Sequence, residues 1–169
     1  TEELRQKMGQ TAVQAAKAVG YENAGTIEFL LDESGEFFFM EMNTRIQVEH
    51  PVSELVSGVD LVKEQIQVAA GLPLSVSQSQ IELRGHAIEC RINAEDPGRN
   101  FMPCPGTIEY LHLPGGNGVR MDTAVYNGYH IPPNYDSMIV KVIVHDKDRP
   151  SAIRKMQSVL GELVIDGLK

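Results

Sequence analysis

Polar side chains that could do chemistry alternate with apolar ones along residues 41–51, which read EMNTRIQVEHP. Alternation at period two is typical of an extended segment with one buried face. If the segment is extended, the polar side chains line one side and follow one another at about 6.6 Å. They are two carboxylates, a guanidinium and two amides, at Glu41, Asn43, Arg45, Gln47 and Glu49.

A helix is the alternative for this stretch, because Glu41, Arg45 and Glu49 are also four residues apart. On a helix they would form a surface ladder of ion pairs, each worth about 0.2–0.5 kcal/mol. The intervening residues are only middling helix formers, and Pro51 disfavours a helical conformation at His50. We therefore expect a strand that runs into a loop, with a short helical turn afterwards, at 53–58.

A β-hairpin is expected immediately before and within this stretch. Thr26–Leu31 and Glu36–Met42 are apolar strand candidates, and the Asp-Glu-Ser-Gly sequence at 32–35 between them is typical of a hairpin turn. With those four residues as the loop, the register places Glu28 opposite Phe39. A slip of one residue would turn one strand's side chains to the other face.

In that register two carboxylates converge on one face of the hairpin. Glu41 becomes the diagonal neighbour of Glu28, at about 7–8 Å between Cα atoms. Asn43 follows two residues later on the same face. Hard cations take oxygen ligands, so these residues suit Mg²⁺ or Mn²⁺. The alternative is a half-solvated sheet face on which water keeps the two carboxylates apart.

The composition indicates an ordinary globular protein. The 169 residues are 42% hydrophobic, and the net charge of -8 argues against a nucleic-acid backbone as the main partner. No apolar run approaches the roughly 18 residues that indicate a membrane span. Cys90 and Cys104 form neither a CxxC pair nor a dense framework, so we expect reduced thiols in the cytoplasm rather than a disulfide.

The rest of the chain divides into a helical part and a β-rich part, with a boundary near residues 83–85. Helices are predicted from apolar periodicity and capping residues at Glu2–Val19, Leu61–Ala70 after Asp60, and Ser151–Leu163. Strands are predicted at His86–Asn93, Gly106–Leu113, Gly118–Ala124 and Met138–His145, with turn residues between them. The fold class is therefore α+β.

The sequence alone suggests a structural role for Arg91. On the strand His86–Asn93 it shares a face with Glu89 and Asn93, so it could simply form a cross-strand ion pair with a glutamate. No P-loop or GxGxxG motif is present, the five histidines show no metal-ligand spacing, and no serine or cysteine lies in a nucleophile motif.

Four longer motifs resemble the biotin carboxylases, the ATP-grasp component of biotin-dependent carboxylases such as acetyl-CoA carboxylase. They are EMNTRIQVEHPV at 41–52, GVDLVKEQ at 58–65, RGHAIECRINAEDP at 84–97 and PPNYDSMI at 132–139. The resemblance runs nearly end to end. It implies that residues 1–84 are the C-terminal half of an ATP-grasp domain and that residues 85–169 are the family's mainly antiparallel β C-terminal domain.

The resemblance also implies roles for individual residues. Glu28 and Glu41 would ligate Mg²⁺ or Mn²⁺ with help from Asn43, which agrees with the cation site inferred from the hairpin. Activating bicarbonate with ATP requires phosphate charge to be neutralised, an oxyanion to be held and a base to be nearby.

The remaining roles concern bicarbonate and biotin. By resemblance, Arg45, Gln47 and the backbone of Val48 would hold bicarbonate, and Glu49 would be the base that deprotonates it. Arg91 would stabilise negative charge on the biotin ureido oxygen. ATP and biotin would be substrates, and the biotin would be carried on a biotin carboxyl carrier protein or domain. A homodimer is also implied.

Some features depart from the family pattern. The loops at 32–35 and 98–100 are slightly longer than expected, although neither contains a residue with an implied role. The chain starts with a helix already under way and lacks the family's N-terminal domain and mobile lid, so we interpret it as part of a longer protein. We expect the fragment alone to be inactive.

Alternatives remain for the function. The parent enzyme could be a pyruvate or propionyl-CoA carboxylase, or another ATP-grasp ligase that activates a different carboxylate. The chain could also be a non-catalytic scaffold or dimerisation fragment.

Overall fold

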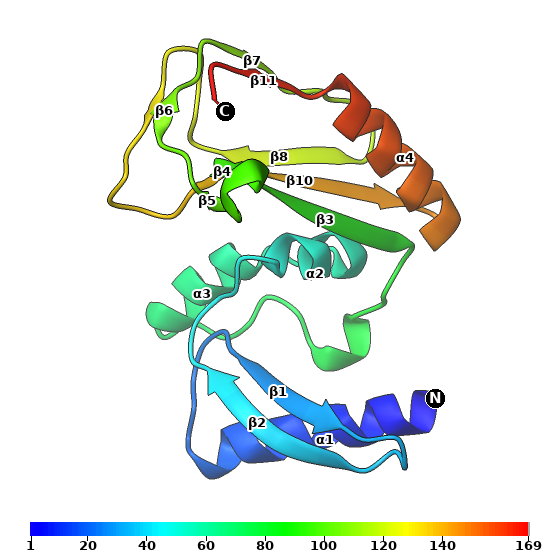
Figure 1. Ribbon diagram of the computed structural model, residues 1–169. Helices are drawn as coiled ribbons and strands as arrows, with labels where there is room; N and C mark the ends of the chain where they lie inside the picture. The colour runs from blue at the N-terminus through cyan, green and yellow to red at the C-terminus, as the bar shows by residue number, and fades with distance from the viewer. Residues whose placement is uncertain (169) are drawn as a thin grey trace. The chain divides into compact units, whose positions relative to one another are not determined.

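The computed structural model describes residues 1–168, which form two compact units (Figure 1). The N-terminal unit consists of Thr1–His50 and Val59–Ile81, and the C-terminal unit consists of Pro51–Gly58 and the residues from Glu82 onward. The short helical segment 51–58 therefore belongs to the C-terminal unit, although the rest of that unit begins only at Glu82.

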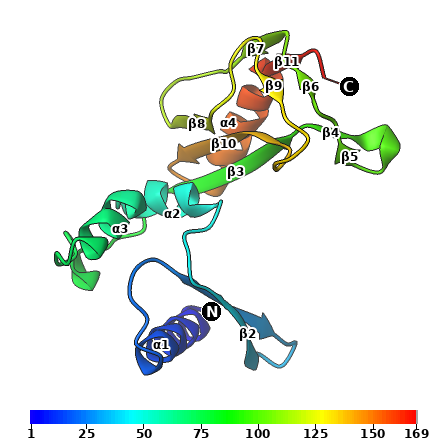
Figure 2. The ribbon, with the colours of Figure 1, turned by 90° about the vertical axis from the view of Figure 1, so that its left-hand side faces the viewer.

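The N-terminal unit contains a long helix, a β-hairpin and a second helix. Its elements are α1 (Glu2–Ala18), β1 (Thr26–Leu31), β2 (Phe37–Asn43), α3 (Leu61–Ala69) and the 3-10 turn η1 (Gln78–Gln80). Thr1 caps α1 by accepting a hydrogen bond from the Leu4 amide at 3.3 Å. Asp60 caps α3 by accepting a hydrogen bond from the Lys63 amide at 3.0 Å. Both predicted helices are confirmed to within a residue. Helix α1 lies alongside the hairpin (Figure 2).

The predicted hairpin register is wrong. The Asp32 amide donates to the Glu36 carbonyl at 2.9 Å, so the loop holds one residue more than expected and β2 begins at Phe37. Phe29 rather than Glu28 therefore lies opposite Phe39. A β-bulge next to Phe29 then shifts the register again, and Glu28 pairs directly with Glu41.

The bulge explains why the two carboxylates still share a face. With the observed turn and regular pairing, Met40 would lie opposite Glu28, and Glu41 would point to the other side of the hairpin. The extra residue in β2 reverses that alternation. Glu28 and Glu41 are consequently direct cross-strand neighbours, closer than the diagonal arrangement that the sequence predicted.

The expected strand along residues 41–49 is shorter than predicted. Strand β2 ends at Asn43, residues 44–49 form a loop and turn, and α2 spans His50–Ser57. Pro51 was expected to disfavour a helix at His50, but α2 begins there, because proline fits the first turn of a helix, where its missing N–H would have no intrahelical partner.

The C-terminal unit is mainly antiparallel β with one long helix. Its elements after α2 are β3 (His86–Asn93), β4 (Glu95–Asp96), η2 (Pro97–Arg99), β5 (Met102–Pro103), β6 (Gly106–Thr107), β7 (Tyr110–His112), β8 (Val119–Thr123), β9 (His130–Ile131), β10 (Met138–Asp146), α4 (Arg149–Glu162) and β11 (Val164–Asp166). The predicted strand 106–113 is broken into two short strands, because Ile108 and Glu109 bond to the separate segments at Tyr129 and Asp166.

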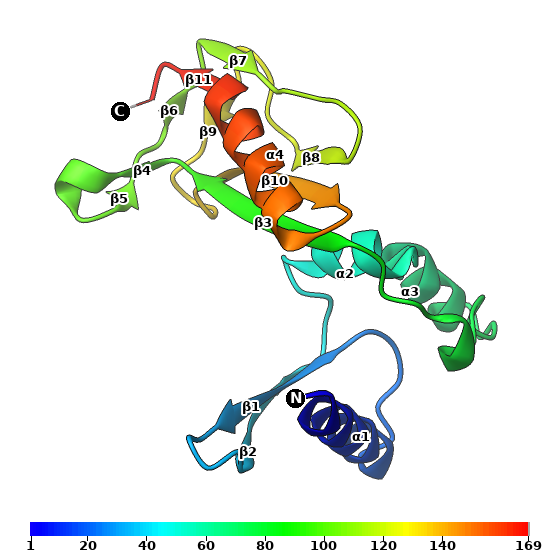
Figure 3. The same ribbon diagram turned by 90° about the vertical axis from the view of Figure 1, so that its right-hand side faces the viewer.

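A three-stranded sheet in the order β3-β10-β8 organises this unit. The central strand β10 carries a buried run from Ile139 to Val144, and α4 covers one face of the sheet (Figure 3). Asp148 caps α4 by accepting from the Ser151 amide at 2.8 Å, and Pro150 occupies its first turn. Within residues 1–168, no helix is long and apolar enough to cross a bilayer.

Candidate active site

Asn43 bridges the two paired carboxylates of the hairpin. Its Nδ2 donates to Glu28 Oε1 at 3.0 Å and to Glu41 Oε1 at 3.1 Å. Glu28 and Asn43 are partly buried, whereas Glu41 is exposed. Two carboxylate oxygens thus converge on a single N–H donor group, which is the arrangement expected where a cation would otherwise balance their charge.

Two further side chains join this network from the loop after β2. Arg45 Nη2 donates to Asn43 Oδ1 at 3.2 Å, and Arg45 Nη1 donates to the Ile46 carbonyl at 3.3 Å. Gln47 Nε2 donates to Glu28 Oε1 at 3.3 Å. The structure therefore brings five of the predicted site residues, Glu28, Glu41, Asn43, Arg45 and Gln47, into one hydrogen-bonded cluster within the N-terminal unit.

This cluster suits a divalent cation of the Mg²⁺ type. Its oxygen donors are two carboxylates and an amide carbonyl, the ligand types that hard cations prefer. Among residues 1–168 no group of three or more His, Cys, Asp or Glu side chains could hold a metal by itself. A cation here would therefore complete its coordination shell with ligands other than these side chains, such as water, as Mg²⁺ commonly does.

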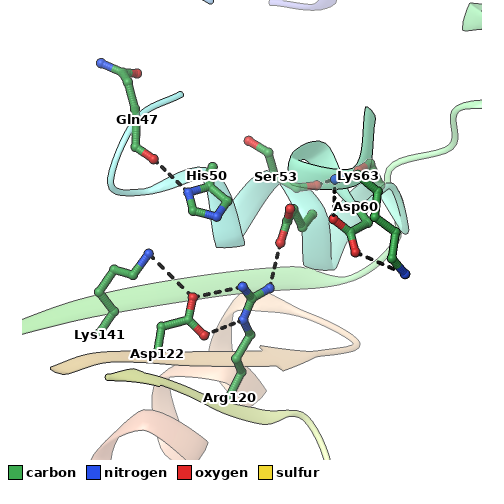
Figure 4. A network of polar contacts seen from close by, with 10 residues as sticks. Gln47, His50, Ser53, Asp60, Lys63, Arg120, Asp122 and Lys141 are labelled. Carbon is green, nitrogen blue, oxygen red and sulfur yellow. Dashed lines mark hydrogen bonds and ion pairs between the residues drawn. The ribbon is translucent and has the colours of Figure 1, made fainter. Parts of the chain in front are cut away.

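Val48 and Glu49 occupy the turn between this cluster and α2. The next residue, His50, is partly buried and its Nδ1 lies 2.8 Å from the Gln47 carbonyl (Figure 4). That contact fixes the turn from its C-terminal side. The sequence predicted no contact for His50.

Arg91 lies on β3 in the C-terminal unit. Its Nε is 3.8 Å from Glu89 Oε1, and the two side chains differ in exposure, at 48% for Arg91 and 5% for Glu89. The ion pair considered from the sequence is thus present, along one strand rather than across two. Burial, followed by the charge of Glu89, raises the pKa of the neighbouring Cys90 thiol. Cys90 and Cys104 are both free, as expected.

Arg120 forms a charged cluster that sequence reasoning missed. Its guanidinium donates to Glu54 at 2.6 Å and to the Asp122 carboxylate at 2.7 and 2.8 Å, and Lys141 Nζ lies 3.5 Å from the same carboxylate (Figure 4). The contact ties the 51–58 segment to the sheet within the C-terminal unit. Glu54 and Arg120 are 66 residues apart, so no local pattern could have indicated the pair.

The charges in this cluster shift the pKa values of its members. Hydrogen bonds of Arg120 raise the pKa of its guanidinium. The bonds to Asp122 contribute most, and the bond to Glu54 contributes less. Burial acts to raise the pKa of Asp122, but the hydrogen bonds and positive charges of Arg120 and Lys141 outweigh it, so the net pKa is lowered. Asp122, Lys141 and Arg91 form one cross-strand row on the sheet face opposite the buried valines of β10.

Two family models match the chain. Residues 1–77 match the carbamoyl-phosphate synthase L chain ATP-binding domain, and residues 89–169 match the biotin carboxylase C-terminal domain. The fold is thus part of an ATP-grasp ATP-binding domain followed by an antiparallel β biotin carboxylase C-terminal domain, as the sequence predicted.

Known relatives agree with this class. The chain is 58% identical over 169 residues to the biotin carboxylase of Haemophilus influenzae and covers 37% of that protein. It is 59% identical over 169 residues to a pyruvate carboxylase subunit of Methanothermobacter thermautotrophicus and covers 34% of it. The crystal structure of the Hydrogenobacter thermophilus 2-oxoglutarate carboxylase biotin carboxylase domain dimer, with MgADP, ADP and bicarbonate, superimposes with a TM-score of 0.95 at 51% identity, over 100% of this chain and 37% of that one.

The chain belongs to the biotin carboxylase family and corresponds to its C-terminal portion. Biotin carboxylases are ATP-dependent ligases. The chain spans a little over a third of the length of the relatives that it matches.

Proposed function

We propose that the protein to which this chain corresponds in part, called here the parent protein, carboxylates biotin at the expense of ATP and bicarbonate through a carboxyphosphate intermediate. The observation that carries the proposal is the cluster of Glu28, Glu41, Asn43, Arg45 and Gln47 in one hydrogen-bonded network. It combines a cation-binding set with side chains that can hold a small oxyanion. The related Hydrogenobacter domain, solved with MgADP and bicarbonate, supports this interpretation.

In the first step, the residues after β2 would hold and activate bicarbonate. The Arg45 guanidinium, the Gln47 side-chain amide and the Val48 backbone N–H supply donors for its oxygens. Glu49 accepts the bicarbonate proton, and the resulting oxygen attacks the γ-phosphorus of ATP. ADP leaves and carboxyphosphate forms. Glu28, Glu41 and Asn43 would hold Mg²⁺, or alternatively Mn²⁺, whose positive charge shields the phosphate oxygens.

In the second step, Arg91 would act on biotin. Carboxyphosphate breaks down to CO2 and phosphate, the released phosphate takes the proton of a ureido nitrogen of biotin, and that nitrogen attacks the CO2 carbon. Negative charge develops on the ureido oxygen as that proton leaves. A guanidinium that donates to this oxygen stabilises the developing charge. With 48% of its side chain exposed, Arg91 can present its donors to a substrate while its Nε faces Glu89.

The division of the chain at 84/85 and the parent enzyme are also part of the proposal. We propose the biotin carboxylase component of acetyl-CoA carboxylase, in cytoplasmic fatty acid synthesis, with a biotin carboxyl carrier protein as partner and a homodimeric assembly. The similarity to a pyruvate carboxylase component favours one alternative acceptor, pyruvate. Incubating the carboxylated carrier with each acceptor and the cognate transferase would discriminate between them.

The test of the activity uses the parent protein with radioactive bicarbonate, ATP, Mg²⁺ and free biotin. We expect bicarbonate-dependent ATP cleavage and label on biotin, whereas a different ATP-grasp ligase would leave biotin unlabelled. We expect no turnover by the 169-residue chain alone. Turnover by that chain would refute the second expectation and leave the first intact.

The metal assignment has its own test. Glu28→Gln or Glu41→Gln in the parent protein should raise the Mg²⁺ concentration required for ATP cleavage and slow the reaction. Circular dichroism should show an unchanged fold. If both variants kept the wild-type Mg²⁺ dependence, these carboxylates would not be the metal ligands.

A further inference from the structure

The two side chains proposed to hold bicarbonate are both hydrogen-bonded to the proposed cation site. Arg45 donates to Asn43 Oδ1 at 3.2 Å, and Gln47 donates to Glu28 Oε1 at 3.3 Å. The N–H groups of Arg45 and Gln47, which an incoming oxyanion would need, are therefore hydrogen-bonded to the Asn43 and Glu28 oxygens, which an incoming cation would need. The two sites compete for the same hydrogen bonds in this structure.

The chemistry of the partners fixes the orientation of the Asn43 amide. Ionised carboxylates only accept hydrogen bonds and a guanidinium only donates them. Asn43 can satisfy Glu28 and Glu41 on one side and Arg45 on the other only with its NH2 group toward the carboxylates and its oxygen toward the guanidinium. The observed bonds have this orientation.

A cation between the two carboxylates requires the opposite orientation. It would bind the amide oxygen of Asn43, and it has no attraction for the NH2 group. If the amide reverses, its NH2 group faces Arg45, which has no acceptor to offer. The hydrogen bond between Asn43 and Arg45 is then lost, and the guanidinium is left to bind an anion.

We propose that Asn43 couples the cation site to the bicarbonate site, because the amide orientation that binds the cation releases Arg45 for bicarbonate. Gln47 is coupled in the same way, because a cation bound to Glu28 competes for the carboxylate oxygen that accepts the Gln47 hydrogen bond. This inference rests on the proposed function of the cluster. Without cation, Asn43 restrains Arg45; with cation, it does not.

Coupling of this kind is reciprocal, so bicarbonate must strengthen cation binding by the same factor by which the cation strengthens bicarbonate binding. Simple attraction between a cation and an anion would also give positive coupling. The two explanations differ in the protein without cation. Only the amide mechanism predicts that removing the Asn43 side chain improves bicarbonate binding there, because Arg45 is then no longer held.

The experiment measures binding to the parent protein, with ADP present throughout. Bicarbonate affinity is measured by line broadening of 13C-bicarbonate in EDTA, and Mn²⁺ affinity is measured from the electron paramagnetic resonance signal of the free ion, with and without bicarbonate. The variants are Asn43→Ala and Asn43→Leu; the second keeps the bulk of the side chain but cannot form hydrogen bonds. Thr44→Ala, at the exposed neighbouring position, is the matched control.

In wild type and Thr44→Ala, saturating bicarbonate should tighten Mn²⁺ binding at least about fivefold, the lower end of typical coupling factors. Both Asn43 variants should show a smaller factor and should bind bicarbonate in EDTA more tightly than wild type. Equal or weaker binding in EDTA by a variant with a wild-type circular dichroism spectrum would overturn the proposal. Absence of biotin labelling by the wild-type parent protein would instead count against the proposed function itself.

Discussion

Replacing Arg91 by alanine separates the two interpretations of this residue. If Arg91 stabilises charge on the biotin oxygen, Arg91→Ala in the parent protein should greatly reduce biotin carboxylation. Biotin-independent, bicarbonate-dependent ATP cleavage should stay closer to normal, because that step does not involve the ureido oxygen. If Arg91 is only the ion-pair partner of Glu89, stability and both activities should fall together.

The expected magnitudes of the two effects differ. Loss of one donor that stabilises developing charge costs about 2.7–4 kcal/mol, or about 10²–10³-fold in rate. The pair with Glu89 spans 3.8 Å and Arg91 is 48% exposed, so its contribution to stability should be about 1 kcal/mol or less. Glu89 is only 5% exposed, however, and removing a cation beside a buried carboxylate can cost as much as about 3–5 kcal/mol.

A double variant resolves this ambiguity. Glu89→Gln removes the buried charge, so Arg91→Ala/Glu89→Gln should recover any stability that was lost by removing the cation beside Glu89. Carboxylation should not recover, because the guanidinium is still missing. Arg91→Lys should also rescue carboxylation poorly if the contact depends on the guanidinium fork rather than on charge alone.

The assay compares label on biotin with phosphate release for each variant, and thermal unfolding is followed in parallel. Recovery of carboxylation in the double variant would refute the reasoning, since it would show that Arg91 acts only by neutralising Glu89. Glu89→Gln alone is the control, and it should carboxylate biotin at a rate near that of wild type.

Three further predictions concern the chain itself. The pKa of Asp122 is lowered in the folded protein. The stability that the Asp122 carboxylate contributes is therefore complete above the ordinary aspartate pKa of about 4, and it is lost as the pH falls through the lowered pKa. Asp122→Asn should flatten this loss of stability at acid pH, as measured by unfolding at a series of pH values. Ile143→Ala, at a core position that is 0% exposed, should cost about 2–5 kcal/mol of unfolding free energy in denaturant titration. Glu41→Gln should raise the melting temperature of the chain in EDTA.

Controls make the first two of these predictions specific. Asp136→Asn changes a carboxylate outside the Arg120 cluster and should leave the acid-side slope of wild type, whereas equal flattening by both variants would remove the special role of Asp122. Val62→Ala, at a position that is 45% exposed, should cost much less than Ile143→Ala. Equal losses would mean that Ile143 is not part of the packed core.

Local signals in the sequence predicted most of the secondary structure. Asp60 before an amphipathic run predicted α3, and the predicted strand Met138–His145, rich in Val and Ile, matches β10 to within a residue. These predictions succeeded because a capping hydrogen bond or a buried face depends on residues close together in the chain. The effect of Pro51 was predicted wrongly because proline breaks a helix interior but fits its first turn. A rule that considers only proline and the preceding residue cannot tell these positions apart.

Features that depend on distant residues could not be predicted in the same way. The contact between Arg120 and Glu54 requires the fold to be known. The hairpin register required two details that no short motif specifies, the position of the turn and the bulge in β2. Five of the residues that the sequence singled out lie in one hydrogen-bonded cluster, but the sequence placed Glu41 diagonally from Glu28 instead of opposite it.

Direct pairing of Glu28 with Glu41 breaks a local rule of sheet stability, and this explains the prediction for Glu41→Gln. Like charges directly opposite each other on a sheet are unfavourable by about 0.2–1 kcal/mol, and such violations concentrate at functional sites. Asn43 offsets part of that cost by donating to both carboxylates. Glu41→Gln removes the repulsion yet keeps an oxygen that can accept from Asn43.

The same substitution should therefore act in opposite directions on folding and on cation binding. Without cation, the melting temperature should rise by about 1–3 °C for a chain of this size. Cation binding should weaken, because a charged ligand is lost. Glu36→Gln, in the hairpin turn away from the paired carboxylates, is the control and should do neither. A melting temperature in EDTA that falls for Glu41→Gln would show that the carboxylate stabilises the hairpin by itself, and the pair would then need no cation to explain it.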